Sequence, residues 1–107
     1  MQRVVICLDV GGTQIKAATV NEHGGILTPI RLVDACAGLA SEQLLDHFTK
    51  IIREQVSLSP DMKIAGVHMA FPGPFDYQHG ISLMRGLDKF DGLYGVDLPH
   101  ELSGRLK

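Results

Sequence analysis

A carboxylate, two glycines, a hydroxyl and a lysine follow one another closely near the start of the chain, in the stretch from Leu8 to Lys16. Gly11 and Gly12 allow a tight turn with positive φ that points successive N–H groups at an anion. Thr13 adds a hydroxyl and Lys16 a positive charge. Asp9 would repel a phosphate chain unless a hydrated Mg²⁺ lay between them. The segment predicts a phosphate-binding loop, with an ordinary hairpin turn as the alternative.

A second segment with unusual turn residues lies in the middle of the chain. A mostly apolar run over 63–70 is followed by Phe71 and then by Pro72, Gly73 and Pro74. The prolines restrict the backbone, and the glycine between them leaves room for a close approach. The pattern predicts a strand followed by a rigid loop, which on its own is more typical of a structural turn than of a binding site.

Hydrophobic periodicity predicts the elements that position these two loops. The expected strands cover residues 3–10, 14–21, 26–33 and 63–70, and the expected helices cover 41–56 and 97–106. The first strand is apolar at nearly every position, so we expect both of its faces to be covered and Asp9 to lie where burial is costly. Pro29 within the third strand indicates a sheet edge or a bulge.

The first helix should begin with Ser41 as its N-cap. Its core stripe is expected to consist of the apolar residues that recur on one helical face, namely Leu44, Leu45, Phe48, Ile51, Ile52 and Val56.

Taken together, the two segments resemble the ROK family of sugar kinases and related repressors, within the hexokinase and actin-like ATPase superfamily. The resemblance rests on Asp-x-Gly-Gly-Thr-x-x-Lys, followed after a helix by Gly-x-x-x-x-x-Pro-Gly-Pro-x-Asp. The matching residues are Asp9, Gly11, Gly12, Thr13 and Lys16, and then Gly66, Pro72, Gly73, Pro74 and Asp76. The resemblance covers essentially the whole chain but not the whole family fold.

The resemblance implies an α/β fold, a ribonuclease H-like (actin-like ATPase) half domain. Its mixed sheet would have three leading antiparallel strands and would be incomplete at the C-terminus. Residues 1–107 would form the N-terminal lobe, with the second lobe absent. The family's general-base aspartate would lie beyond Lys107, so this chain would hold no catalytic residue and would be inactive alone. The missing strand would leave a sheet edge open, which makes a homodimer possible.

For the full-length protein, the resemblance implies a glucokinase-like, ATP-dependent carbohydrate kinase. Asp9 would hold Mg²⁺ through water. The phosphates of ATP would contact Gly11, Gly12, Thr13 and Lys16, and the sugar would contact Gly73 and Pro74. Two alternatives stay open: a non-catalytic sugar-sensing or transcriptional regulator, and a stand-alone interaction module.

Composition favours one compact domain, since 107 residues that are 45% hydrophobic and 21% charged can bury one modest core. A net charge of −2 gives no electrostatic footprint for nucleic acid. Cys7 and Cys36 are too few for a disulfide framework and are expected to be reduced residues in or near the core. The apolar run Val4–Val10 is too short for a membrane span and lacks a signal-peptide pattern. We therefore expect a cytoplasmic protein with no membrane or nucleic-acid partner, and the family resemblance implies a role in carbohydrate metabolism.

Overall fold

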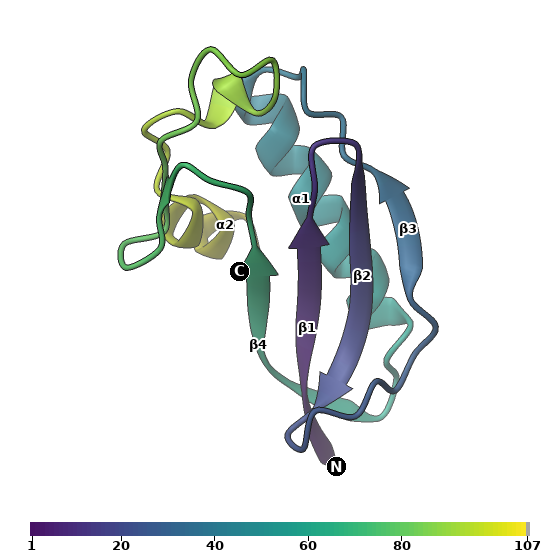
Figure 1. The fold of residues 1–107 in the computed structure, drawn as a ribbon. Coiled ribbons are helices and arrows are strands. Elements are labelled where there is room, and N and C mark those ends of the chain that lie inside the picture. Colours follow the sequence, from purple (N-terminus) through teal and green to yellow (C-terminus); the bar gives the residue numbers. More distant parts are fainter. Residues whose placement is uncertain (107) are drawn as a thin grey trace.

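A computed structural model of the chain describes residues 1–106 and shows a mixed sheet with α-helices packed against one of its faces (Figure 1). The elements in chain order are β1 (Gln2–Val10), β2 (Gln14–Asn21), β3 (Arg31–Asp34), α1 (Ser41–Ser57), β4 (Met62–Ala70), β5 (Phe75–Asp76), β6 (Ile81–Ser82), the 3-10 turn η1 (Asp91–Leu93) and α2 (Leu98–Leu106).

The main sheet has the strand order β3-β2-β1-β4. β1 pairs antiparallel with β2 and parallel with β4, and β2 pairs antiparallel with β3. The predicted mixed sheet with three leading antiparallel strands is therefore confirmed. A bulge between Val4 and Val5 shifts the register of β1 against β4 by one residue, so that Ala65 has no partner.

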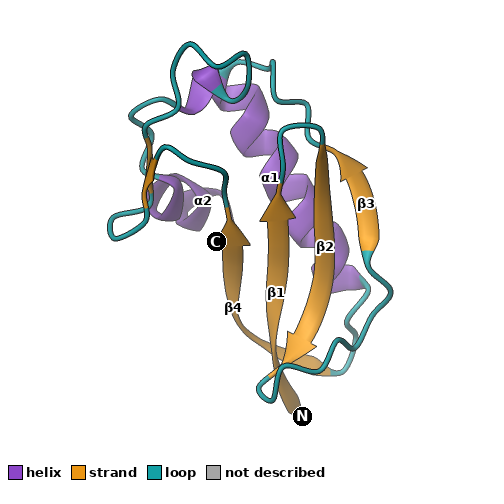
Figure 2. Cartoon of the chain, viewed as in Figure 1, coloured by secondary structure: helices purple, strands orange, loops and turns teal. Residues whose placement is uncertain are grey.

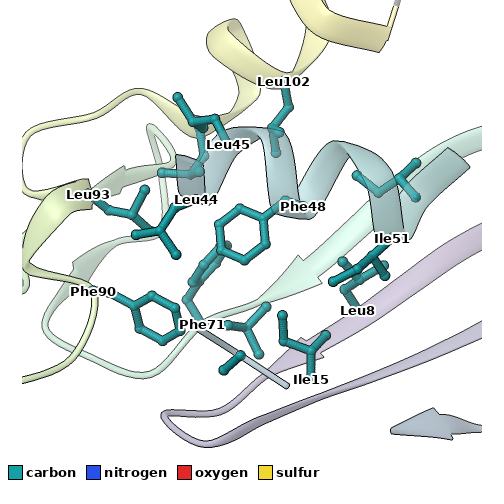
Figure 3. Close-up of a cluster of buried hydrophobic side chains, with 14 of the residues drawn as sticks. Leu8, Ile15, Leu44, Leu45, Phe48, Ile51, Phe71, Phe90, Leu93 and Leu102 are labelled. Atoms are coloured by element: carbon teal, nitrogen blue, oxygen red, sulfur yellow. The ribbon is translucent and has the colours of Figure 1, made fainter. Parts of the chain in front are cut away.

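The core lies between the sheet and α1, with α2 and η1 closing its sides (Figure 3). Alternate residues of β1, such as Ile6 and Leu8, point into it and are fully buried. Phe48 of α1 stands at its centre, with ring centroids 5.7 Å from Phe71 and 6.3 Å from Phe90. These three rings tie the first helix to the two segments that follow β4 and β6.

The other face of the sheet is not covered by any element within residues 1–106, which corrects the expectation that β1 is covered on both faces. Val5 and Cys7 on that face are half-buried, and Asp9 is exposed. Cys7 is therefore a residue of an open sheet face and not of the core. Burial does raise the pKa of its thiol.

The third strand is shorter than predicted. β3 covers Arg31–Asp34 at the sheet edge, so the edge position indicated by Pro29 is correct, but Pro29 itself lies before the strand. Ile26 forms only an isolated bridge with Val20. Pro29 has no N–H to donate to a neighbouring strand, and it lies in the stretch before β3 that does not pair continuously with β2.

The first helix differs from prediction at both ends. Its N-cap is Ala40, which makes no side-chain capping bond, and Ser41 is already helical. Near its C-terminus Val56 is 40% exposed, whereas the neighbouring Gln55 is fully buried. The polar residue therefore takes the core position that hydrophobicity had assigned to Val56.

Gln55 is buried because it is the centre of a hydrogen-bond network. Its Nε2 donates to Thr19 Oγ1 and to Thr28 Oγ1, each at 3.0 Å, and its Oε1 accepts from Arg31 Nε at 3.0 Å. The Ser59 hydroxyl donates to the Gln55 carbonyl and lies 2.6 Å from the Thr19 hydroxyl. The amide thus replaces its lost water contacts with protein partners.

The edge of the sheet at β4 faces an apolar groove of about 440 Å³ beside α2. Val67, Met69, Leu102 and Leu106 are among its lining residues. Within residues 1–106, neither helix has the length and apolar character needed to cross a membrane.

Candidate functional site

The two motifs come together because they follow neighbouring parallel strands. Asp9, the last residue but one of β1, pairs in register with Ala70, the last residue of β4. The loop 11–13 leaves β1 and the loop 71–74 leaves β4 at the same edge of the sheet, among the connecting loops in Figure 2. Ligands of open α/β sheets bind outside such carboxyl ends. The sheet thus places both motifs where a shared ligand site can form.

The turn between β1 and β2 is tight, and its backbone is accessible. Gly11 N–H donates to the Gln14 carbonyl at 2.9 Å, and a Cβ on Gly11 would lie only 3.0 Å from that oxygen. The Thr13 carbonyl accepts from Ala35 N–H at 2.9 Å, which fixes the turn against the end of β3. No hydrogen bond within residues 1–106 uses the N–H of Gly12 or Thr13, and both residues are exposed. These two donors are available to an anion.

The glycines are needed for a reason other than the predicted one. Neither Gly11 nor Gly12 has positive φ. Gly11 has little room for a side chain because its own turn closes on it, whereas a Cβ on Gly12 would lie 3.3 Å from the flexible side chain of Lys89, which would have to shift only slightly. Close approach, and not left-handed backbone, explains the glycine at position 11.

Asp9 and Lys16 lie opposite each other in the antiparallel pair of β1 and β2, on the open face of the sheet. Both are exposed, and within residues 1–106 neither takes part in an ion pair. In the same part of the chain, no three His, Cys, Asp or Glu side chains gather as ligands for a metal ion. An exposed carboxylate without a partner fits a hydrated Mg²⁺, which commonly takes one or two carboxylates and completes its shell with water and phosphate.

The loop after β4 is fixed from both ends. Tyr77 Oη donates to the Phe71 carbonyl at 2.8 Å, and Leu83 N–H donates to the Pro74 carbonyl at 3.2 Å. Gly73 and Pro74 are exposed, and a Cβ on Gly73 would meet nothing closer than 4.0 Å. The loop is therefore rigidly held, with free space on the side of its glycine.

Asp76 supports this loop from the hairpin of β5 and β6. Its Oδ2 lies 2.9 Å from His79 Nδ1, and its Oδ1 accepts from His79 N–H at 3.2 Å. The hydrogen bond to His79 is the main reason that the pKa of Asp76 is lowered. Asp76 thus has a structural role in the turn, and sequence reasoning had not assigned it one.

The sequence interpretation missed Lys89. Its Cδ lies 3.3 Å from the point that a Cβ on Gly12 would occupy, so the side chain lies over the glycine turn between β1 and β2. A lysine in a glycine-rich stretch 77 residues after Gly12 carries no local pattern that would have indicated this contact.

Solved structures of sugar kinases share this fold. A glucokinase from Parabacteroides distasonis has a TM-score of 0.77 and 27% identity, and the match covers 97% of this chain and 28% of that one. An inorganic polyphosphate/ATP-glucomannokinase from Arthrobacter sp. strain KM has a TM-score of 0.77 and 25% identity, and the match covers 97% and 41%.

A ROK family glucokinase from Streptomyces griseus, solved in complex with glucose and AMPPNP, has a TM-score of 0.76 at 22% identity, with 96% of this chain and 30% of that one covered. The chain therefore spans less than half the length of each of these proteins. No protein-family model and no curated protein matches the sequence. The fold comparisons confirm the resemblance indicated by the two motifs: over nearly all of its length, this chain is similar to part of the ROK-family glucokinases and related sugar kinases.

Proposed function

We propose that the chain is the N-terminal lobe of an ATP-dependent sugar kinase of the ribonuclease H-like, actin-like ATPase fold. The reaction is transfer of the γ-phosphoryl group of ATP to a sugar hydroxyl. The observation that carries the proposal is the register of Asp9 with Ala70, because it brings the glycine turn and the proline loop to one edge of the sheet.

The phosphate side of the site is built from β1 and the start of β2. The N–H groups of Gly12 and Thr13 bind phosphate oxygens, with Gly11 shaping the turn that presents them. Lys16 adds positive charge on the open sheet face. Asp9 would hold a hydrated Mg²⁺, and the ion would neutralise the charge that develops on the transferred group.

The sugar side of the site is the loop after β4. Gly73 and Pro74 contact the sugar, and the bonds to the carbonyls of Phe71 and Pro74 keep the loop in place when the sugar enters. Phosphoryl transfer depends mainly on positioning and charge neutralisation, so a rigid sugar loop beside a phosphate turn meets its main requirements.

The general base lies outside these 107 residues. An attacking hydroxyl needs a carboxylate within hydrogen-bonding reach as its base, and the family resemblance implies that this aspartate lies on a later strand. We therefore expect the 107-residue chain to bind ligands without phosphorylating a sugar. Release of ADP with glucose in a coupled assay of this chain would contradict that assignment.

The test of the site is an NMR titration of the ¹⁵N-labelled chain with a non-hydrolysable ATP analogue, with and without Mg²⁺. The amide signals of Gly11, Gly12 and Thr13 should shift, and Mg²⁺ should strengthen binding. Asp9→Asn should remove the effect of Mg²⁺, because the carboxylate that holds the ion is gone. Glu22→Gln, an exposed change at the far end of β2, is the matched control. Unshifted turn signals at millimolar analogue would refute the site.

A further inference from the structure

The Lys89 side chain lies over the glycine turn, which it reaches from the segment after β6. Because its Cδ is packed over Gly12, its ammonium, two bonds further on, is confined to the neighbourhood of the turn. Lys89 is half-buried and makes no ion pair with any carboxylate in residues 1–106. Its charge is therefore uncompensated beside two free N–H donors.

The backbone on both sides of Lys89 is held in an unfavourable conformation. Asp88 has φ of 59° and Phe90 has φ of 55°, both in the left-handed region. Such values are uncommon for residues other than glycine and are costly for a bulky side chain. These two left-handed residues restrict the backbone on both sides of Lys89 and so set the direction in which its side chain points.

Contacts within the core maintain this conformation. The Phe90 side chain is fully buried against Phe48 and Phe71, and its N–H donates to the Ala37 carbonyl at 2.8 Å. Gly92 packs against the residues just before α1, and a Cβ there would lie 2.7 Å from the Leu39 carbonyl oxygen. The backbone immediately after Lys89 is therefore held in place by the core, and this keeps the lysine beside the turn.

Lys16 and Lys89 approach the turn from different sides. Lys16 lies on the open face of the sheet, whereas the segment of Lys89 is packed on the side of α1. We propose that Lys89 is a further phosphate-binding residue, which contacts the phosphate chain of the donor from the α1 side. This inference rests on the proposed function, because it takes the glycine turn to be the phosphate site.

Inorganic tripolyphosphate with Mg²⁺ is a suitable probe because it carries a phosphate chain without a base or ribose. Binding to the 107-residue chain is followed at the amides of Gly11, Gly12 and Thr13. Lys89→Met keeps the aliphatic stem over Gly12 and removes the charge, so it should raise the Kd about three- to tenfold, the range for one charge-assisted contact at a partly exposed site. Lys89→Arg should bind as the unchanged chain does.

Lys63→Met is the control, since Lys63 is exposed on β4 and pairs in register with Arg3 at the far end of the sheet. It should leave the Kd unchanged, and Lys89→Gln provides a second neutral variant if Lys89→Met folds poorly. A Kd that is the same for both neutral variants and the unchanged chain would reduce Lys89 to a packing role while leaving the turn as a phosphate site. No shift of the turn amides in the unchanged chain would overturn both this inference and the proposed phosphate site.

Discussion

Replacement of Gln55 by alanine is expected to cost this fold more stability than its single polar side chain suggests. The Gln55 amide donates to the hydroxyls of Thr19 and Thr28 and accepts from the Arg31 guanidinium. Two hydrogen bonds between neutral groups contribute about 1 kcal/mol each, and one to a charged group about 1.5–3 kcal/mol, so the expected loss is about 3.5–5 kcal/mol. A small domain has a total of only about 5–15 kcal/mol.

The measurement is urea unfolding followed by far-UV circular dichroism, because the chain contains no tryptophan. Gln55→Leu separates the loss of hydrogen bonds from the loss of packing, since leucine retains most of the side-chain volume and removes only the polar contacts. It should be less destabilising than Gln55→Ala. Val56→Ala, at the neighbouring position that is 40% exposed, is the control and should change the free energy of unfolding by about 1 kcal/mol or less.

The slope of the free energy against urea should be the same in all four proteins, because the surface exposed on unfolding is nearly unchanged. If Gln55→Ala lost less than about 1 kcal/mol, the hydrogen bonds would be contributing less than their usual net values. The reasoning that this network fastens α1 to β2 would then be wrong.

Three further predictions concern the backbone, pH and self-association. Gly92→Ala should destabilise the fold by about 1–3 kcal/mol in the same urea assay, because its Cβ would meet the Leu39 carbonyl. Gly38→Ala is the control, since a Cβ there meets nothing, and equal losses of stability in the two variants would contradict the prediction. Because the pKa of Asp76 is lowered from 3.8, its contribution to the β5–β6 turn is complete above that pH and is lost as the pH falls below it. The NMR signal of the His79 amide should report this loss in the unchanged chain and not in Asp76→Asn. The open edge of β4 and its apolar groove should make the 107-residue chain self-associate at micromolar concentration, which light scattering would refute by finding a monomer throughout.

The sequence predicted the bounds of the long strands well, but it did not predict which of their residues are buried. β2 has the predicted bounds, and β1 and β4 differ from prediction by one residue each, because their apolar runs are long and end at glycine or proline. The alternation of burial along β1 could not be read from the same run, since an apolar residue suits a covered and an open face alike. The exposure of Asp9 was missed for this reason.

Long-range contacts explain the other differences. Gln55 is buried because Thr19, Thr28 and Arg31 happen to meet it, and none of these partners is near it in sequence. Lys89 lies over Gly12 for a similar reason, since its position depends on how Phe90 enters the core. By contrast, the family resemblance carried by the two motifs implied one site for both loops, although the pairing of β1 with β4 that brings them together is itself a long-range contact.

The Gln55 network and the candidate site lie at opposite ends of α1 and β2, as the course of the two elements in Figure 1 shows. The contacts that hold the helix to the sheet at one end are therefore separate from the loops that would meet ligands at the other. Substitutions at sites more than about 7–10 Å apart that share no partner generally have additive effects. Substitutions in the exposed loop around Gly73, which we propose as the sugar loop, should therefore leave the stability contributed by the Gln55 network unchanged.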